Sequence, residues 1–241
     1  MTLRLFPLID TLFNSLKRKR QSVLDLYASI LYKHFPQFKR LSAADQQLFA
    51  ERVYRFRKSK TIHFLEMEES EDIAVLVSAA AIQLTFGLPK FHFGFFTDIY
   101  IISGAYTYGL SQAPWAGHVN REGIHVAWDH VMKGYASEND GYNVGLHEMA
   151  HALEYEIAYG DYMDDMMLRR RFNQVIYVIK DTVFRQQEQP VSAIFSEQGL
   201  TNVHECWAES VEFFFEDPAK LKDFYPELYE AICLLLNRRP L

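Results

Sequence analysis

The sequence contains little cysteine, and this scarcity limits the kinds of site and scaffold that it can form. Only Cys206 and Cys233 occur among the 241 residues. A disulfide scaffold or a cysteine-based structural zinc site needs more thiols than these two. Any metal site must therefore take its ligands from histidine and carboxylate side chains. The two thiols fit a reducing compartment.

Long apolar runs and an excess of positive charge are also lacking. No stretch of about 18 apolar residues could span a bilayer, and residues 1–20 place apolar side chains before the charges, the reverse of a secretory signal. We therefore expect a cytoplasmic protein without a transmembrane segment, and we do not expect its first helix to rest on a membrane surface. The formal net charge of −6 argues against nucleic-acid binding, which requires a basic surface.

Apolar residues are abundant, and their spacing predicts mainly helices. Hydrophobic residues make up 49% of the chain, which is enough to build a substantial core. Helical patterns are present over residues 22–58, 71–85, 165–187 and 226–237. Within the first of these, Ser42 and Asp45 resemble a capped helix start. Leu48, Val53 and Phe56 recur at helical spacing and are expected in the core.

The pattern changes in the middle of the chain. Residues 91–130 are rich in aromatic and β-branched side chains, which predicts two or more short strands, with a turn at 120–123. Strands followed by helices predict an α+β fold, here a mostly helical domain with a small β-sheet before the helix of residues 145–156.

The stretch GLHEMAHALEYE, residues 145–156, contains the pattern His-Glu-x-x-His. On a helix, His147 and His151 project from nearly the same face one turn apart, so both imidazoles can reach one Zn²⁺. Glu148 is then placed beside the attacking water, as a general base must be. Asn143 is a suitable N-cap for this helix. The short pattern can occur by chance, so a third ligand is required.

The later stretch HECWAESVEFFFED, residues 204–217, offers that third ligand. Glu205, Glu209 and Glu212 are spaced by four and three residues, so all three share one helix face and periodicity does not choose among them. Glu205 could instead complete a capping box with Asn202, and the other two could be solvated acids. However, the helix is apolar almost all round, and acids on a buried helix need partners, which a zinc site would supply.

Both stretches resemble the motifs of one family. YNVGLHEMAHALE is similar to the first signature of the Mlc titration factor A family of zinc peptidases, and TNVHECWAESVEFFFEDP is similar to the second. Looser similarity extends over most of the chain. The late motif also resembles that of the catalytic domain of anthrax lethal factor, an endopeptidase. Two motifs in the correct order are far more specific than HEMAH alone.

The resemblance implies a role for each motif residue. It makes His147 and His151 ligands of one Zn²⁺ per chain, with Glu205 as the third ligand. It makes Glu148 the general base. It further implies a zinc peptidase-like catalytic domain, which we expect over residues 61–241, whereas residues 1–60 are expected to form a helical extension packed on the core of one compact unit.

Other residues near the motifs remain candidates for supporting roles. Glu212 is the rival third ligand because it also matches a family glutamate, and Glu209 is expected to support the site or lie at the surface. The family carries an oxyanion-binding tyrosine seven residues before the ligand glutamate, where this chain has Gln198. Gln198 or Tyr142 is therefore the expected oxyanion or substrate contact. We expect His204 to be a surface or helix-end histidine and not a fourth ligand.

These features favour a zinc-dependent metallopeptidase acting on a peptide or protein substrate. Glu148 would take a proton from the attacking water and deliver it to the leaving amine. The strand GIHVAW, residues 123–128, would bind the extended peptide along its edge. The alternative is a weakly catalytic or non-catalytic zinc protein that binds a regulatory partner, such as a transcription repressor, as the resemblance also implies. Gln198 favours that alternative, but a purely structural site would not need Glu148. A third reading, an all-helical scaffold with a chance HEMAH, leaves the later glutamates unexplained.

Overall fold

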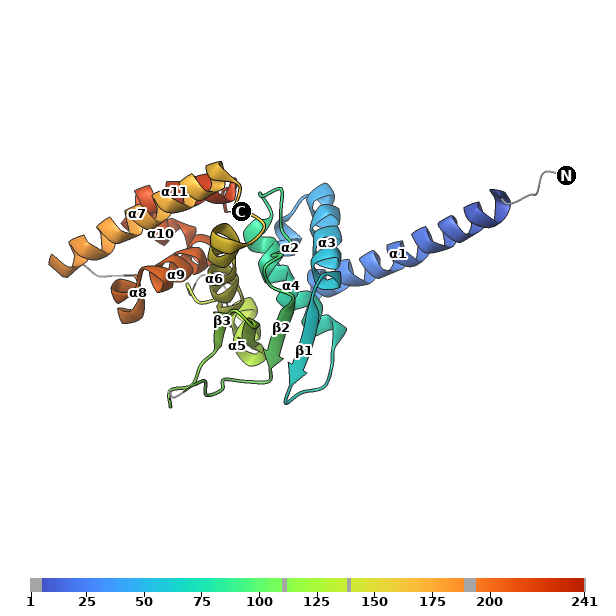
Figure 1. The fold of residues 1–241 in the computed structure, drawn as a ribbon, viewed down its shortest axis with the longest axis horizontal. Coiled ribbons are helices and arrows are strands. Elements are labelled where there is room, and N and C mark those ends of the chain that lie inside the picture. The colour runs from blue at the N-terminus through green and yellow to red at the C-terminus, as the bar shows by residue number, and fades with distance from the viewer. Residues whose placement is uncertain (1–5, 110–111, 138–139, 189–193, 241) are drawn as a thin grey trace.

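The computed structural model describes residues 6–109, 112–137, 140–188 and 194–240. Helices pack against a small sheet, and the first helix projects from the body of the protein (Figure 1). The predicted α+β, mostly helical architecture is confirmed.

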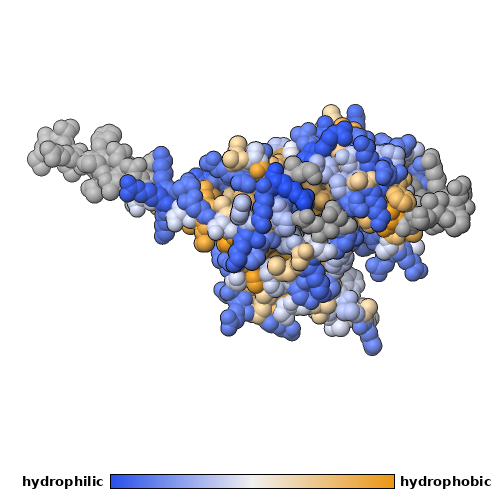
Figure 2. Space-filling view, turned by 180° about the vertical axis from the view of Figure 1, so that it is seen from behind, coloured by the Kyte–Doolittle hydropathy of each residue, from blue (hydrophilic) through white to orange (hydrophobic). Residues whose placement is uncertain are grey.

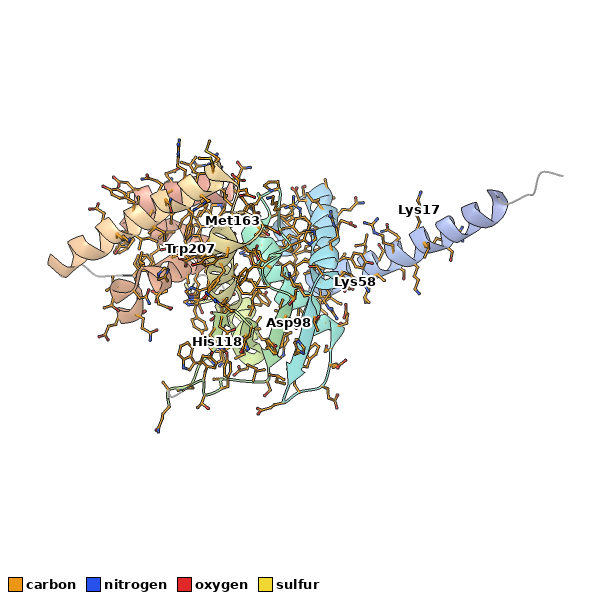
Figure 3. All side chains as sticks on the ribbon, in the orientation of Figure 1. Lys17, Lys58, Asp98, His118, Met163 and Trp207 are labelled. Atoms are coloured by element: carbon orange, nitrogen blue, oxygen red, sulfur yellow. The ribbon has the colours of Figure 1, made fainter. Side chains whose placement is uncertain are left out.

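The chain begins with three helices, of which the first packs on the rest of the fold through only part of its length. They are α1 (Phe6–His34), α2 (Pro36–Arg40) and α3 (Ala43–Lys58). Residues 15–22 of α1 are exposed, and Figure 3 shows Lys17 on this projecting part. The second half of α1 buries Tyr27, Ile30 and Leu31 in the same hydrophobic core as the later helices. The expected division of the chain at residue 60 stays a prediction.

Helix α3 begins as the sequence predicts but turns a different face to the core. The Ser42 hydroxyl accepts a hydrogen bond from the Asp45 backbone N–H at 3.2 Å, and Val53 and Phe56 are buried. The prediction for Leu48 is wrong, because 43% of that residue is exposed. Phe49 is buried instead, since the residues at positions 49, 53 and 56 form the stripe that packs against the core.

Four strands form one sheet, in the order β1 (Thr61–Leu65), β2 (Asp98–Ile102), β4 (Gly123–Ala127) and β3 (Gly117–Asn120). The β1–β2 and β2–β4 pairs are parallel, and β3 is antiparallel to β4. The inward side chains of β2 and β4 are fully buried. The sequence patterns did not indicate β1, which precedes α4 (Glu71–Thr85).

The position of the strand GIHVAW within the sheet differs from the prediction. Its first five residues form β4, which pairs with β2 on one side and with β3 on the other. The expectation that this strand has a free edge is therefore wrong. The tight turn between Asn120 and Gly123 folds β3 back along β4, and this places β3 at the edge.

The second half of the chain is helical and is centred on α6 (Val144–Tyr159). The remaining helices are α5 (Trp128–Ala136), α7 (Met166–Glu188), α8 (Glu197–Thr201), α9 (Val203–Glu216), α10 (Pro218–Phe224) and α11 (Pro226–Leu236). The helical patterns of the sequence did not indicate the short helix α8. Trp207, labelled in Figure 3, is fully buried and donates from Nε1 to the Ala150 carbonyl at 2.9 Å. This contact fixes α9 against α6.

Among the described residues, no helix is both long enough and apolar enough to cross a membrane. The face shown in Figure 2 is mostly hydrophilic, with hydrophobic residues in small separate groups.

Candidate metal centre

The start of α6 is anchored by Asn143. Its side-chain oxygen accepts from the Leu146 backbone N–H at 3.1 Å, which satisfies one of the free amide groups of the first turn. Its amide nitrogen donates to Glu216 Oε1 at 2.8 Å. The predicted N-cap is thus present, and it also links α6 to the end of α9. The register of the HEMAH residues follows from this fixed start.

Two histidines from α6 and one glutamate from α9 meet in a tight cluster. The Nε2 atoms of His147 and His151 are 3.2 Å apart. Carboxylate oxygens of Glu205 lie 3.4 Å from His147 Nε2 and 3.5 Å from His151 Nε2. One ligand atom from each residue lies within 4.8 Å of the others, so the three can contact a single metal ion.

Glu212 lies behind His147 and supports it. Its Oε1 accepts from the ring N–H at Nδ1 of His147 over 2.7 Å, and its other oxygen accepts from the Asn143 backbone N–H. Because Nδ1 carries the proton, Nε2 of His147 keeps a free lone pair, and it faces Nε2 of His151. A histidine that binds a metal through Nε2 has this arrangement. Burial lowers the pKa of His147, but the hydrogen bonds to Glu205 and Glu212 raise it well above its usual value.

The third α6 residue of the motif, Glu148, is buried beside the cluster. Only 5% of this residue is exposed, and its Oε2 has no hydrogen-bond partner among the described atoms. Burial, together with the charges of Glu205 and Glu212, raises the pKa of Glu148 to about 8, although His147 opposes this shift. A carboxylate that has a raised pKa and one oxygen without a hydrogen-bond partner is suited to exchange a proton near neutral pH.

Two further polar residues of α9, Glu209 and His204, point away from the cluster. Glu209 accepts from the Ser196 backbone N–H at 2.8 Å and from the Ser196 hydroxyl, so it holds the start of α8. His204 is exposed, and its Nδ1 lies 2.7 Å from Glu154 Oε1. Glu209 and His204 therefore lie outside the three-residue cluster.

A cleft of about 1150 Å³ opens over the cluster. One wall is β3 with the segment before it, the floor is α6, and the opposite wall is formed by α8 and α9. Gln198 and Tyr142 both line this cleft. Tyr142 is 40% exposed, and its hydroxyl is 2.6 Å from Nδ1 of His130. Burial and the charge of Glu212 raise the pKa of Tyr142 to about 12.

Along β3, no strand of the described residues pairs with the edge that faces the cleft. The Ala127 N–H donates to the Ala116 carbonyl, which fixes the alternation of hydrogen bonds between β3 and β4. By this alternation, the backbone groups of Gly117 and Val119 point away from β4, toward the cleft. Just before them, Trp115 exchanges backbone hydrogen bonds with Tyr106 on the same side. The edge at Gly117 and Val119 is therefore placed to pair with an added strand.

Gly117 is a site residue that the sequence motifs do not indicate. A Cβ atom at this position would lie 2.5 Å from Oε1 of Glu148, so glycine is what allows the buried carboxylate to lie against the edge strand. The partners Glu154 and His130 were likewise not expected. All three lie within a strand or a helix but outside the motifs, so only the fold brings Gly117 and Glu154 to the cleft and His130 to Tyr142.

The site is thus a histidine pair and a glutamate on two packed helices of an α+β protein, at the floor of a cleft beside a sheet edge, with donor atoms close enough for one metal ion. Comparison with protein families agrees with this class: the description "glucose-regulated metallo-peptidase M90" applies to the family whose model matches residues 13–235. The chain belongs to this metallopeptidase family, which is the Mlc titration factor A family that the motifs resemble. A search of the curated proteins gave no match.

The contact between Gly117 and Glu148 leads to a first prediction. Gly117→Ala should lower the free energy of unfolding by about 1–3 kcal/mol, because the added methyl group overpacks a buried contact. Urea denaturation measures this. Gly104→Ala is the matched control, since a Cβ there would lie 3.7 Å from its nearest neighbour. In a Glu148→Ala background the clashing atoms are gone, so Gly117→Ala should cost much less. An equal cost in both backgrounds would contradict the proposed contact.

Proposed function

We propose that the protein is a zinc-dependent peptidase that hydrolyses peptide bonds with Glu148 as the general base. The observation that carries this proposal is the His147, His151 and Glu205 cluster at the floor of an open cleft, with Glu148 buried beside it. Membership in a metallopeptidase family supports the same reaction class.

The spacing of the ligand atoms supports zinc as the metal. Ligands at 2.0–2.1 Å around a tetrahedral zinc ion lie about 3.3 Å from one another. The three separations within the cluster, 3.2, 3.4 and 3.5 Å, are close to this value. Two imidazoles and one carboxylate are also a donor set found in catalytic zinc sites, where a fourth position stays open. His147, His151 and Glu205 would therefore hold the ion.

The residues of this chain then divide the catalytic work. A zinc ion bound there would polarise the scissile carbonyl and acidify the attacking water. Glu148 would accept a proton from that water and later donate it to the leaving amine. Its buried position directly beside the two histidines suits both transfers. Glu212 would keep His147 in the tautomer that exposes Nε2 to the ion.

The edge of β3 would hold the substrate in an extended conformation. The outward backbone groups of Gly117 and Val119 can form hydrogen bonds with a peptide strand, as in other cases of strand addition to a sheet edge. Because Gly117 lies against Glu148, a peptide paired with this edge would pass directly over the general base. The sheet edge therefore orients the scissile bond as well as supplying affinity.

Tyr142 is the stronger candidate for the group that stabilises the developing oxyanion. If the N–H of His130 at Nδ1 donates to the Tyr142 oxygen, the hydroxyl proton stays free for the substrate. Gln198 is exposed on α8 across the cleft, and no side-chain hydrogen bond among the described residues fixes its amide. A donor held by a second residue is better organised for catalysis.

The metal assignment predicts the zinc content of single variants. Purified protein should contain about one zinc per chain, and His147→Ala and His151→Ala should lose it, because each removes one of three ligands. Elemental analysis gives the measurement. His204→Ala is the matched control, since this neighbouring histidine pairs with Glu154 and should leave the zinc content unchanged.

The same measurement decides between the two glutamates. Glu205→Gln should remove most of the zinc, whereas Glu212→Gln should weaken binding by about 10–100-fold and remain loaded at high zinc, as expected for a residue that supports a ligand. Loss of zinc in Glu212→Gln alone would show that the third ligand is misassigned. Full zinc content in both histidine variants would remove the site.

The general-base assignment predicts a variant that binds zinc but does not turn over. Glu148→Gln should retain zinc and lose about 10²–10⁴-fold in kcat, since it keeps the shape of the side chain but not its basic oxygen. Peptide hydrolysis with and without a chelator provides the assay, and the exposed Glu122→Gln is the control. Wild-type rates in a zinc-loaded Glu148→Gln protein would contradict this role. If wild-type protein cleaves nothing in a broad peptide library, a zinc-dependent binding protein becomes the better description.

The oxyanion assignment predicts a difference between Tyr142 and Gln198. Tyr142→Phe should lower kcat by about 10²–10³-fold with zinc retained, because it removes one donor to the transition state. The exposed Tyr177→Phe on α7 serves as the control. A large loss in Gln198→Ala with none in Tyr142→Phe would transfer the role to Gln198.

A further inference from the structure

One end of the cleft combines a basic residue with aromatic side chains. Phe95, before β2, donates its backbone N–H to Glu156 Oε1 at 2.7 Å, which ties the start of β2 to the last turns of α6. Ile99 of β2 pairs with Ile124 of β4, so the turn that joins β3 to β4 lies at this same end. Arg121 occupies that turn and lines the cleft.

The distance from the cluster to this end can be estimated along two elements. From Gly117 to Arg121 the edge strand advances about 13 Å. From Glu148 to Tyr155, helix α6 advances about 10 Å in the same direction. An extended peptide lying along β3 would therefore reach Arg121 about three to four residues from the bond above Glu148.

Arg121 is the one lysine or arginine among the described residues that line the cleft. Its side chain is exposed, and no ion pair within the described ranges involves it. The acid Glu154, which also lines the cleft, is already paired with His204. A guanidinium group on the wall of a cleft is available for a carboxylate brought by a ligand, and its planar fork suits that partner.

Aromatic residues on α6 face this end of the cleft. Tyr155 and Tyr159 both line it, and their rings contact the ring of Phe95 with centroids 5.8 and 6.2 Å away. Tyr159 is 64% exposed. An apolar wall beside a charged group lowers the local exposure to water, which strengthens an ion pair formed there.

We propose that Arg121 binds a carboxylate of the substrate, so that the cleft selects peptides with a negative charge about three to four residues from the scissile bond. This inference rests on the proposed peptidase function, because it assumes a peptide lying along β3. The carboxylate can come from an Asp or Glu side chain, or from the free C-terminus of a short peptide. Both present the same group to the guanidinium.

Peptide binding to zinc-loaded Glu148→Gln protein tests the inference without turnover. One neutral peptide carries a single Glu or Gln at each position in turn, and fluorescence anisotropy gives each Kd. At one position Glu should bind about three- to tenfold tighter than Gln, and added salt should reduce this preference. A second pair, ending at that position as a free acid or an amide, separates the C-terminal carboxylate from the side chain.

Variants of Arg121 in the same background assign the preference to this residue. Arg121→Gln should bring the Glu-to-Gln ratio close to one, Arg121→Lys should keep part of it, and Arg121→Glu should favour peptides with Lys at that position. Lys58→Gln, a change of an exposed lysine outside the cleft, should leave the ratio as it was. The kcat/KM ratio of wild-type protein for the same peptide pairs provides an independent reading.

The outcomes separate this inference from the proposed function. Charge-selective binding that Arg121→Gln removes, in a protein whose wild type cleaves no peptide, supports the subsite and rejects the peptidase. Cleavage with no Glu preference, or with a preference that survives Arg121→Gln, supports the peptidase and overturns the subsite. Absence of peptide binding in every variant also overturns the subsite.

Discussion

The candidate site depends on the hydrogen bonds that the buried carboxylate of Glu212 accepts. One of its oxygens accepts from the His147 ring, and the other accepts from the backbone N–H of Asn143, the N-cap of α6. A carboxylate in a nearly dry position is stable only when such donors surround it. These two hydrogen bonds therefore fix the start of α6, the tautomer of His147 and the position of α9 through one side chain.

The antiparallel packing of α6 and α9 gives each glutamate of α9 a different set of contacts. Glu212 lies at the start of α6, while His204, at the opposite end of α9, reaches Glu154 two turns further along α6. Glu205 lies between these contacts and faces both histidines, whereas Glu209 turns to α8. Acids that share one helix face in the sequence are thus separated by what lies opposite each of them.

The sheet contributes to the site through close contact rather than through ligands. Gly117 lets the edge strand approach Glu148, and the same strand continues to the turn that carries Arg121. Strand pairing and charge recognition would therefore share one short element, which also borders the side chain that transfers the proton. Since β3 and α6 advance in the same direction, a peptide on the edge would meet the general base first and the aromatic side chains of α6 further along.

Local spacing in the sequence determined which side chains lie together on one helix and which residues cap it. The spacing of His147 and His151 places two imidazoles together wherever the helix lies, and Asn143 and Ser42 cap their helices through bonds to the next few residues. The α+β class also followed from the order of periodic patterns. These features involve neighbours in the chain, so local stereochemistry is sufficient to specify them.

Only the tertiary structure decided how the separate elements meet. Three glutamates on one face of α9 are equivalent by periodicity, and the packing against α6 and α8 distinguishes them. The strand of residues 123–127 had the pattern of a strand, but its place between β2 and β3 depends on which partners pair with it. The exposure of Leu48 likewise follows from the rotation of α3 against the core. Each outcome depends on contacts between residues far apart in the chain, which a local pattern does not encode.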